Sequence, residues 1–135
     1  MPLDLTPRDY TPADHDMLAD WWTRHKWPVI PAGMLPAKGI IIGNHAAGFL
    51  YDDPTSQVAG IEWIVTNPDN SPHESYKAII QLLAALKGLA IDHGKIGVFS
   101  TCKQYSLARC FEKSGMQRTD ENMIHFLEIF TPSES

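Results

Sequence analysis

The chain has 135 residues, the length of one ordinary domain, and 44% of them are hydrophobic while 20% are charged. This composition excludes a disordered or fibrous protein. Lysine and arginine total 11 against 16 acidic residues, for a formal charge of −5, so we expect no nucleic-acid partner. No apolar run approaches the ~20 residues needed to span a bilayer, so we expect no membrane partner either.

Cysteine usage and the N-terminus favour a cytoplasmic location. Cys102 and Cys110 are the two cysteines, and two thiols suit a reducing compartment better than a disulfide framework. The segment 1–4 has no basic stretch followed by an apolar run, so we expect no secretory signal. The six histidines show no metal-ligand spacing, and no metal is expected.

The N-terminal elements are a short strand and a helix. Residues 3–6 alternate apolar and polar side chains, which predicts an edge strand that ends at Pro7. Residues 11–14 combine a capping threonine, a proline at the first helical position and a carboxylate at the third. Apolar residues then recur at spacings of three and four, which predicts a helix that ends near His25 or Lys26.

A proline-rich segment follows, from residue 27 to residue 36. Three prolines rule out a regular element, but the segment is apolar enough to lie over the core or to form one wall of a pocket. Trp21, Trp22 and Trp27 form an aromatic cluster beside it. Adjacent tryptophans on one helix are not expected to face inward together, so core packing, a pocket wall and a partner surface all stay open.

The centre of the chain predicts three strands joined by tight turns. Residues 39–42 lead into a Gly-Asn turn, 46–51 form the return strand, and 58–66 form a long third strand after an Asp-Asp-Pro-Thr turn. This order is typical of an antiparallel meander.

A long helix and a further strand come next. Ser71, Pro72 and Glu74 form a second capping signature, and the apolar periodicity continues to about Asp92. Residues 96–101 predict a buried strand, so strand, helix and strand imply a parallel pair. The segment 103–113 predicts a short helix, and 116–130 predicts two short strands.

Several local sequences resemble the GNAT N-acetyltransferase superfamily. Residues 64–69, Ile-Val-Thr-Asn-Pro-Asp, are similar to the end of the family's fourth strand. Residues 107–116 are similar to its last helix, which ends in an aromatic-Glu-Lys-x-Gly-aromatic run. The segment 21–51 resembles small GNAT-like proteins encoded by bacteriophages. The resemblance covers nearly all of the chain.

This resemblance implies an α/β (α+β) fold in a single domain, residues 1–135. Its mixed sheet is mostly antiparallel, with a central parallel pair splayed around a cofactor gap and helices on both faces. Acetyl-CoA would be the acyl donor, with its pantetheine arm in the gap and its pyrophosphate at the start of the long helix. The implied contacts are Ile64, Val65, Thr66, Ser75, Tyr76, Lys77, Ser106 and Phe111.

The start of the long helix departs from the family pattern. Lys77 and Ile79 stand at two positions where the family has glycines. Two interpretations stay open for this region. It is either a phosphate site made by amides, a hydroxyl and an ammonium at Ser75, Tyr76 and Lys77, or a helix start with a structural role only. Ser106 likewise lies at a common ligand edge or serves as a cap.

Glu62 is the candidate general base, because a carboxylate in mid-strand beside the cofactor gap can deprotonate an ammonium. Alternation places Glu62 on one face with Gly60 and Ile64, and Ile61, Trp63 and Val65 on the other. The alternative is a solvated glutamate. Many family members use a tyrosine as the acid, but Phe111 occupies that position. Tyr105 and Cys110 are the candidate replacements.

Two functions follow from these interpretations. The first is an acetyl-CoA-dependent N-acetyltransferase that acts on a small-molecule or peptide amine by direct attack. The second is a GNAT-shaped protein without activity that works through protein–protein contacts. A homodimer is compatible with either function.

Overall fold

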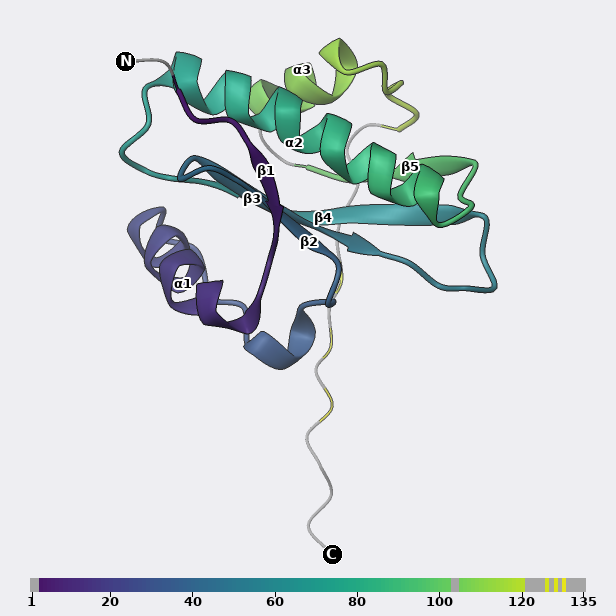
Figure 1. Ribbon diagram of the computed structural model, residues 1–135, viewed down its shortest axis with the longest axis horizontal. Helices are drawn as coiled ribbons and strands as arrows, with labels where there is room; N and C mark the ends of the chain where they lie inside the picture. Colours follow the sequence, from purple (N-terminus) through teal and green to yellow (C-terminus); the bar gives the residue numbers. More distant parts are fainter. Residues whose placement is uncertain (1–2, 103–104, 121–125, 127, 129, 131–135) are drawn as a thin grey trace, which may run out of the picture.

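The computed structural model describes residues 3–102, 105–120, 126, 128 and 130 (Figure 1). Five strands form one sheet in chain order: β1 (Pro7–Asp9), β2 (Gly39–Ile42), β3 (Ala46–Tyr51), β4 (Val58–Thr66) and β5 (Gly97–Phe99). Neighbouring strands from β1 to β4 are antiparallel, and β5 runs parallel to β4. The mixed sheet and its parallel pair confirm the α+β fold class, although within the described residues this pair lies at one edge of the sheet.

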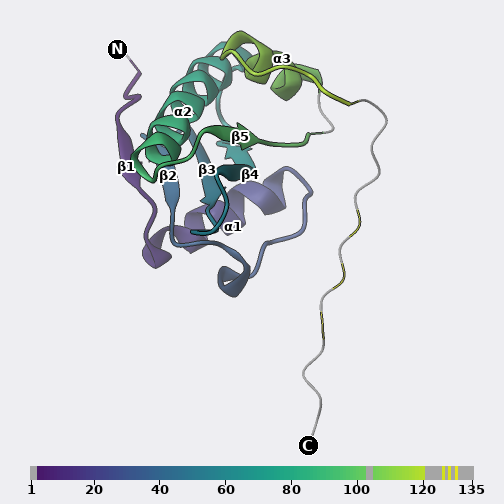
Figure 2. The ribbon, with the colours of Figure 1, turned by 90° about the vertical axis from the view of Figure 1, so that its right-hand side faces the viewer.

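Helices cover both faces of the sheet, as Figure 2 shows. The long helix α2 (Pro72–Asp92) and the short helix α3 (Tyr105–Lys113) lie on one face, and α1 (His15–Arg24) lies on the other. A short 3-10 turn at Pro12–Asp14 precedes α1, and a second one at Ala32–Met34 lies in the loop between α1 and β2. In the part of the chain that the structure describes, no helix is both long and apolar enough to cross a membrane.

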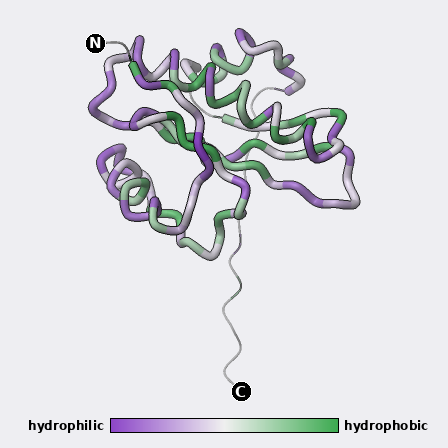
Figure 3. Tube along the Cα trace, in the orientation of Figure 1, coloured by the Kyte–Doolittle hydropathy of each residue, from purple (hydrophilic) through white to green (hydrophobic). Residues whose placement is uncertain are grey.

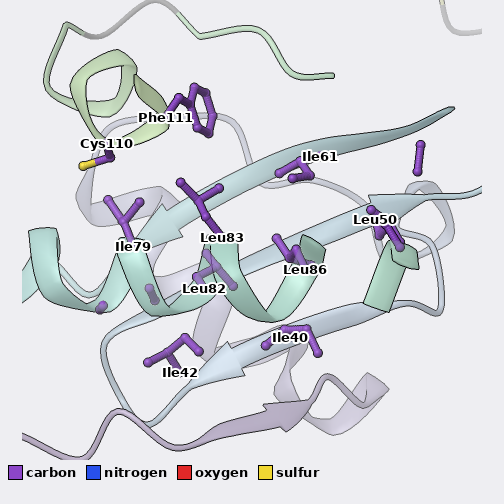
Figure 4. Packing of buried hydrophobic residues seen from close by; sticks show 14 residues of the cluster. Ile40, Ile42, Leu50, Ile61, Ile79, Leu82, Leu83, Leu86, Cys110 and Phe111 are labelled. Atoms are coloured by element: carbon purple, nitrogen blue, oxygen red, sulfur yellow. The ribbon is translucent and has the colours of Figure 1, made fainter. Parts of the chain in front are cut away.

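The α2 face holds the larger core. Leu82, Leu83 and Leu86 of α2 are fully buried over β2, β3 and β4 (Figure 4). Figure 3 shows that hydrophobic residues gather on the central strands and along α2. Gly48 of β3 permits the close approach of the helix, because a Cβ at this position would lie 3.1 Å from the Leu82 side chain. Full burial of each leucine contributes about 1.5–3 kcal/mol.

The α1 face holds a second core, in which both adjacent tryptophans are buried. Trp21 is 3% exposed and Trp22 is 2% exposed. The expectation that two neighbouring tryptophans cannot both face inward is therefore wrong. The sheet covers α1 from one side and the loop after it packs from another, through Trp27, Ile30 and Leu35, so each tryptophan meets apolar partners.

The predicted bounds of β2, β3 and β4 are confirmed. The strand predicted as buried over 96–101 is only Gly97–Phe99, and Phe99 is exposed. The predictions at the two ends of the chain also need correction. The first strand is Pro7–Asp9 and not 3–6, because the pairing with β2 starts where the Gly43 amide donates to the Thr6 carbonyl. Proline is tolerated as the first residue of an edge strand. Residues 116–120 form no strand, and most of the two strands predicted for 116–130 lies outside the described residues.

Candidate functional site

The parallel strands β4 and β5 are paired over only part of their length. The ladder joins Val58–Gly60 of β4 to Gly97–Phe99 of β5. Beyond it, Ser100 Oγ donates to the Ile61 carbonyl at 2.6 Å, and β4 continues to Thr66 along an edge that β5 does not pair. Beyond Gly60, therefore, β5 forms no ladder with β4 in the part of the chain that the structure describes.

A β-bulge interrupts β4 where the two strands separate. Trp63 and Ile64 together face the single residue Gly48 of β3, and Trp63 has a φ of +58°. A bulge bends its strand and raises the local twist. The Trp63 indole donates to the Tyr51 hydroxyl at 2.6 Å, which in turn donates to the Met34 carbonyl at 2.8 Å. These bonds hold Trp63 in a backbone conformation with positive φ, which residues other than glycine rarely adopt.

The bulge corrects the predicted faces of β4. Ile61 and Ile64 pack with the α2-side core, whereas Trp63 and Val65 pack with the α1-side core. Strict alternation had grouped Ile61 with Trp63 and Val65, which is wrong because the extra residue resets the pattern. Glu62 pairs in register with Phe49, so the half-buried Glu62 lies on the α1 face just before the bulge.

A cavity of about 280 Å³ opens at the far end of β4, between that strand, the first turns of α2, and α3. Its lining combines apolar walls with hydroxyl groups and one thiol. Burial raises the pKa of the Cys110 thiol above its usual value, so the sulfur stays protonated at neutral pH. The lining residues are Trp27, Ile64, Val65, Thr66, Pro72, Ser75, Tyr76, Ile79, Ser106, Leu107 and Cys110.

The cavity brings together most of the residues that the sequence analysis singled out for the acyl donor. Ile64, Val65, Thr66, Ser75, Tyr76 and Ser106 all line it. Lys77 is exposed and Phe111 is buried in the α2-side core, and neither belongs to the described lining. Tyr105 begins α3, but its side chain lies outside the described part of the structure.

His25, which no sequence pattern pointed to, contacts the edge of β4 that β5 does not pair. The Asn67 amide donates to the His45 carbonyl at 2.9 Å, so ladder alternation turns the backbone of Thr66 away from β3. His25 Nε2 donates to the Thr66 carbonyl at 2.8 Å, and its ring stacks on Trp27 at 4.6 Å. No sequence motif marks His25, because its contact with Thr66, 41 positions away, depends on how the end of α1 lies against β4.

The start of α2 is capped by its own side chains. Ser71 Oγ accepts the Glu74 amide at 3.2 Å, and the Glu74 carboxylate accepts the Ser71 amide at 2.7 Å. This second bond lowers the pKa of Glu74. The Ser75 amide already donates to the Ser71 carbonyl at 3.0 Å, so it is not available to a phosphate. Pro72 has no amide hydrogen to offer.

An ion cluster with two buried members, Asp52 and Lys95, lies at the opposite end of α2. The Asp52 carboxylate is 2.6 Å from Lys95 Nζ and 2.5 Å from Lys38 Nζ. Hydrogen bonds from Lys38 and then Lys95 lower the pKa of Asp52 from 3.8 to about 2. Lys95 also donates to the carbonyls of Asp53 and Ser56, so it fixes the loop between β3 and β4.

Comparisons with known proteins identify the fold. No family model and no curated protein matches the chain. A crystal structure of a Trypanosoma brucei acetyltransferase is 18% identical with a TM-score of 0.64, covering 92% of this chain and 100% of that one. AAC(6')-Iy in complex with a CoA bisubstrate analogue is 15% identical with a TM-score of 0.61, covering 93% and 99%.

A third structure, a transcriptional regulator from Bacillus halodurans C-125, is 17% identical with a TM-score of 0.63, covering 90% of this chain and 99% of that one. The chain therefore has the fold of the GNAT acetyltransferases. At these identities the likeness establishes the fold, and the activity has to be argued from the site.

Proposed function

We propose that this protein is an acetyl-CoA-dependent N-acetyltransferase that transfers the acetyl group to an amine by direct attack. The observation that carries the proposal is the cavity at the unpaired edge of β4, where strand backbone faces a partly apolar hollow. An extended donor arm can pair with such an edge as a strand does. The similar structures include acetyltransferases, one of them solved with a CoA analogue.

The donor arm would lie along the backbone of Ile64 and Thr66. A carbonyl oxygen has two lone pairs, so the Thr66 carbonyl can accept a donor amide in addition to His25. Ile79 and Leu107 line the same cavity and keep water from the thioester. A donor held in this way presents its carbonyl carbon to an incoming amine.

In the transfer step the amine nitrogen attacks the thioester carbonyl carbon, the carbon–sulfur bond breaks, and the thiolate leaves. Glu62, which lies on the α1 face and is not among the described lining residues, would take the proton from the amine, directly or through a water. Backbone amides of β4 would stabilise the charge that develops on the carbonyl oxygen. Tyr105 and Cys110 are the candidates to protonate the thiolate, and Cys110 lies on the cavity with its proton retained by burial.

The second candidate function is a GNAT-shaped binding protein without acetyl transfer, which acts through contacts with another protein. The self-capped start of α2 favours it, since this is the helix end where the resemblance places the pyrophosphate. Donor binding separates the two functions.

The first experiment is a thermal-shift titration with acetyl-CoA. At 100 times its Kd, a ligand of the folded state adds about 2.7 kcal/mol of stability. We expect a concentration-dependent rise in the melting temperature. No rise at millimolar acetyl-CoA would reject the acetyltransferase and leave the binding protein.

The second experiment measures turnover with a panel of peptide and small-molecule amines. Glu62→Gln should slow transfer by about 10²- to 10⁴-fold while donor binding is retained. Glu112→Gln is the matched control, because Glu112 is an exposed residue of α3 that pairs with Arg118. Equal rates in the two variants would remove Glu62 from the mechanism.

A further inference from the structure

The chemistry of the cavity fits one part of acetyl-CoA better than the other. None of the lining residues that the structure describes is a lysine, arginine, histidine, aspartate or glutamate. The lining includes four hydroxyl-bearing residues among apolar ones, Thr66, Ser75, Tyr76 and Ser106, and Ser75 Oγ already accepts a hydrogen bond from Asn70 Nδ2 at 3.2 Å. An uncharged arm that carries amides and one hydroxyl, as pantetheine does, finds matching partners in such a lining, whereas phosphate groups need cations or free amides.

The size of the cavity agrees with this division. A volume of about 280 Å³ is slightly below the ~300–1,000 Å³ typical of small-molecule sites. It can enclose the arm of acetyl-CoA but not the nucleotide as well.

The neighbouring end of α2 opposes a phosphate group. Ser71 and Glu74 cap the helix with each other, and the Glu74 carboxylate adds a negative charge at the place where an anion would approach. Lys77 is exposed and does not belong to the described lining. The formal charge of −5 on the chain adds a weak repulsion at longer range.

We infer that this site recognises its donor by the pantetheine arm alone, so that uncharged acyl-pantetheine thioesters are donors equivalent to acetyl-CoA. The inference rests on the proposed function, and it names the class of donor. The nucleotide of acetyl-CoA remains outside the cavity and adds little to affinity.

The test compares S-acetyl-pantetheine with acetyl-CoA by isothermal titration calorimetry on the full chain. We expect dissociation constants within about tenfold of each other, and no loss of acetyl-CoA affinity between about 50 and 500 mM NaCl. Tighter binding of acetyl-CoA by more than that factor, or a loss with salt, would overturn the inference and leave the acetyltransferase standing. If neither thioester binds, both proposals fail.

A charge variant provides a second measurement. Glu74→Gln removes the carboxylate beside the cavity and should tighten acetyl-CoA by about threefold without changing S-acetyl-pantetheine. Asp92→Asn, an exposed change at the other end of the same helix, is the matched control and should change neither. Melting temperatures of both variants check that α2 stays folded. Tightening of both thioesters alike, or of neither, would contradict the exclusion of phosphate by Glu74.

Discussion

The two edges of β4 differ in what they contact. Its β3 edge is paired from Gly60 to Thr66 apart from the bulge, and the strands on that side carry fully buried side chains of both cores. Its β5 edge is paired only from Val58 to Gly60 and then borders the cavity. The paired edge fixes the strand in place, which leaves the open edge free to present backbone to a ligand. Substitutions near the first should change stability, and substitutions near the second should change binding.

The largest effect is expected on the paired side, in the core over β3. Leu82→Ala removes a side chain with no exposed surface and leaves a cavity, which should lower the free energy of unfolding by about 2–5 kcal/mol. Gln81→Ala, at the exposed neighbouring position, should change it by less than about 0.5 kcal/mol. Denaturant unfolding measures both. Equal losses would mean that α2 is not packed on the sheet as described.

The next largest change in stability is expected at the end of the β4–β5 pair where the two strands are hydrogen-bonded, next to the ion cluster of Asp52, Lys38 and Lys95. Lys95→Met leaves the Asp52 carboxylate with Lys38 as its main partner and releases the loop carbonyls that Lys95 binds. We expect a loss of about 3 kcal/mol in the free energy of unfolding. The control is Lys113→Met, a change at an exposed lysine of α3. A neutral or stabilising result for Lys95→Met would show that methionine packing replaces the ion pair.

Low pH should destabilise the protein through the same ion cluster. The pKa of Asp52 is about 2 in the folded state against 3.8 without its partners, so its contribution is complete above about pH 5 and is lost as the pH falls through 2. Asp14, whose pKa the Arg8 side chain also lowers to about 2, adds to this window. The melting temperature should fall from pH 5 to pH 2, and less steeply in Asp52→Asn. Parallel slopes would remove Asp52 as a source of acid sensitivity.

The smallest change in stability is expected at the open edge. Ser106→Ala removes one hydroxyl from an exposed position on the cavity, so the melting temperature should stay unchanged. Donor affinity should fall by about two- to tenfold, which is the effect of one lost hydrogen bond. Calorimetry with S-acetyl-pantetheine measures the loss. A large fall in melting temperature with unchanged affinity would place Ser106 in the stability of α3 instead.

Sequence patterns predicted the paired region well. The bounds of β2, β3 and β4 follow from turn residues and apolar runs, and α2 starts at the capping signature of Ser71, Pro72 and Glu74. These signals are local, because each turn or cap is made by residues a few positions apart. The parallel pairing of β4 and β5 also followed from element order.

Features that depend on distant contacts escaped prediction. The bulge at Trp63 leaves no mark in the local sequence, since it is defined by the register with β3. His25 at the end of α1 contacts the Thr66 carbonyl, which lies 41 positions further along the chain. The pair of Asp52 and Lys95 joins residues more than 40 positions apart. The lining residues could be named from the family resemblance, but the neutral character of the cavity required the structure.

The bulge has a consequence for insertions and deletions. Trp63 is the extra residue of β4. If it is left out, the remaining side chains alternate regularly between the two faces: Ile61 and Ile64 face α2, and Glu62 and Val65 face α1. Loss of that single codon would leave an eight-residue strand with every remaining side chain on its present face. Loss of the codon for Ile61 would instead turn one part of β4 inside out. Position 63 is thus the point in this strand where one residue can be deleted while every other side chain keeps its face of the sheet.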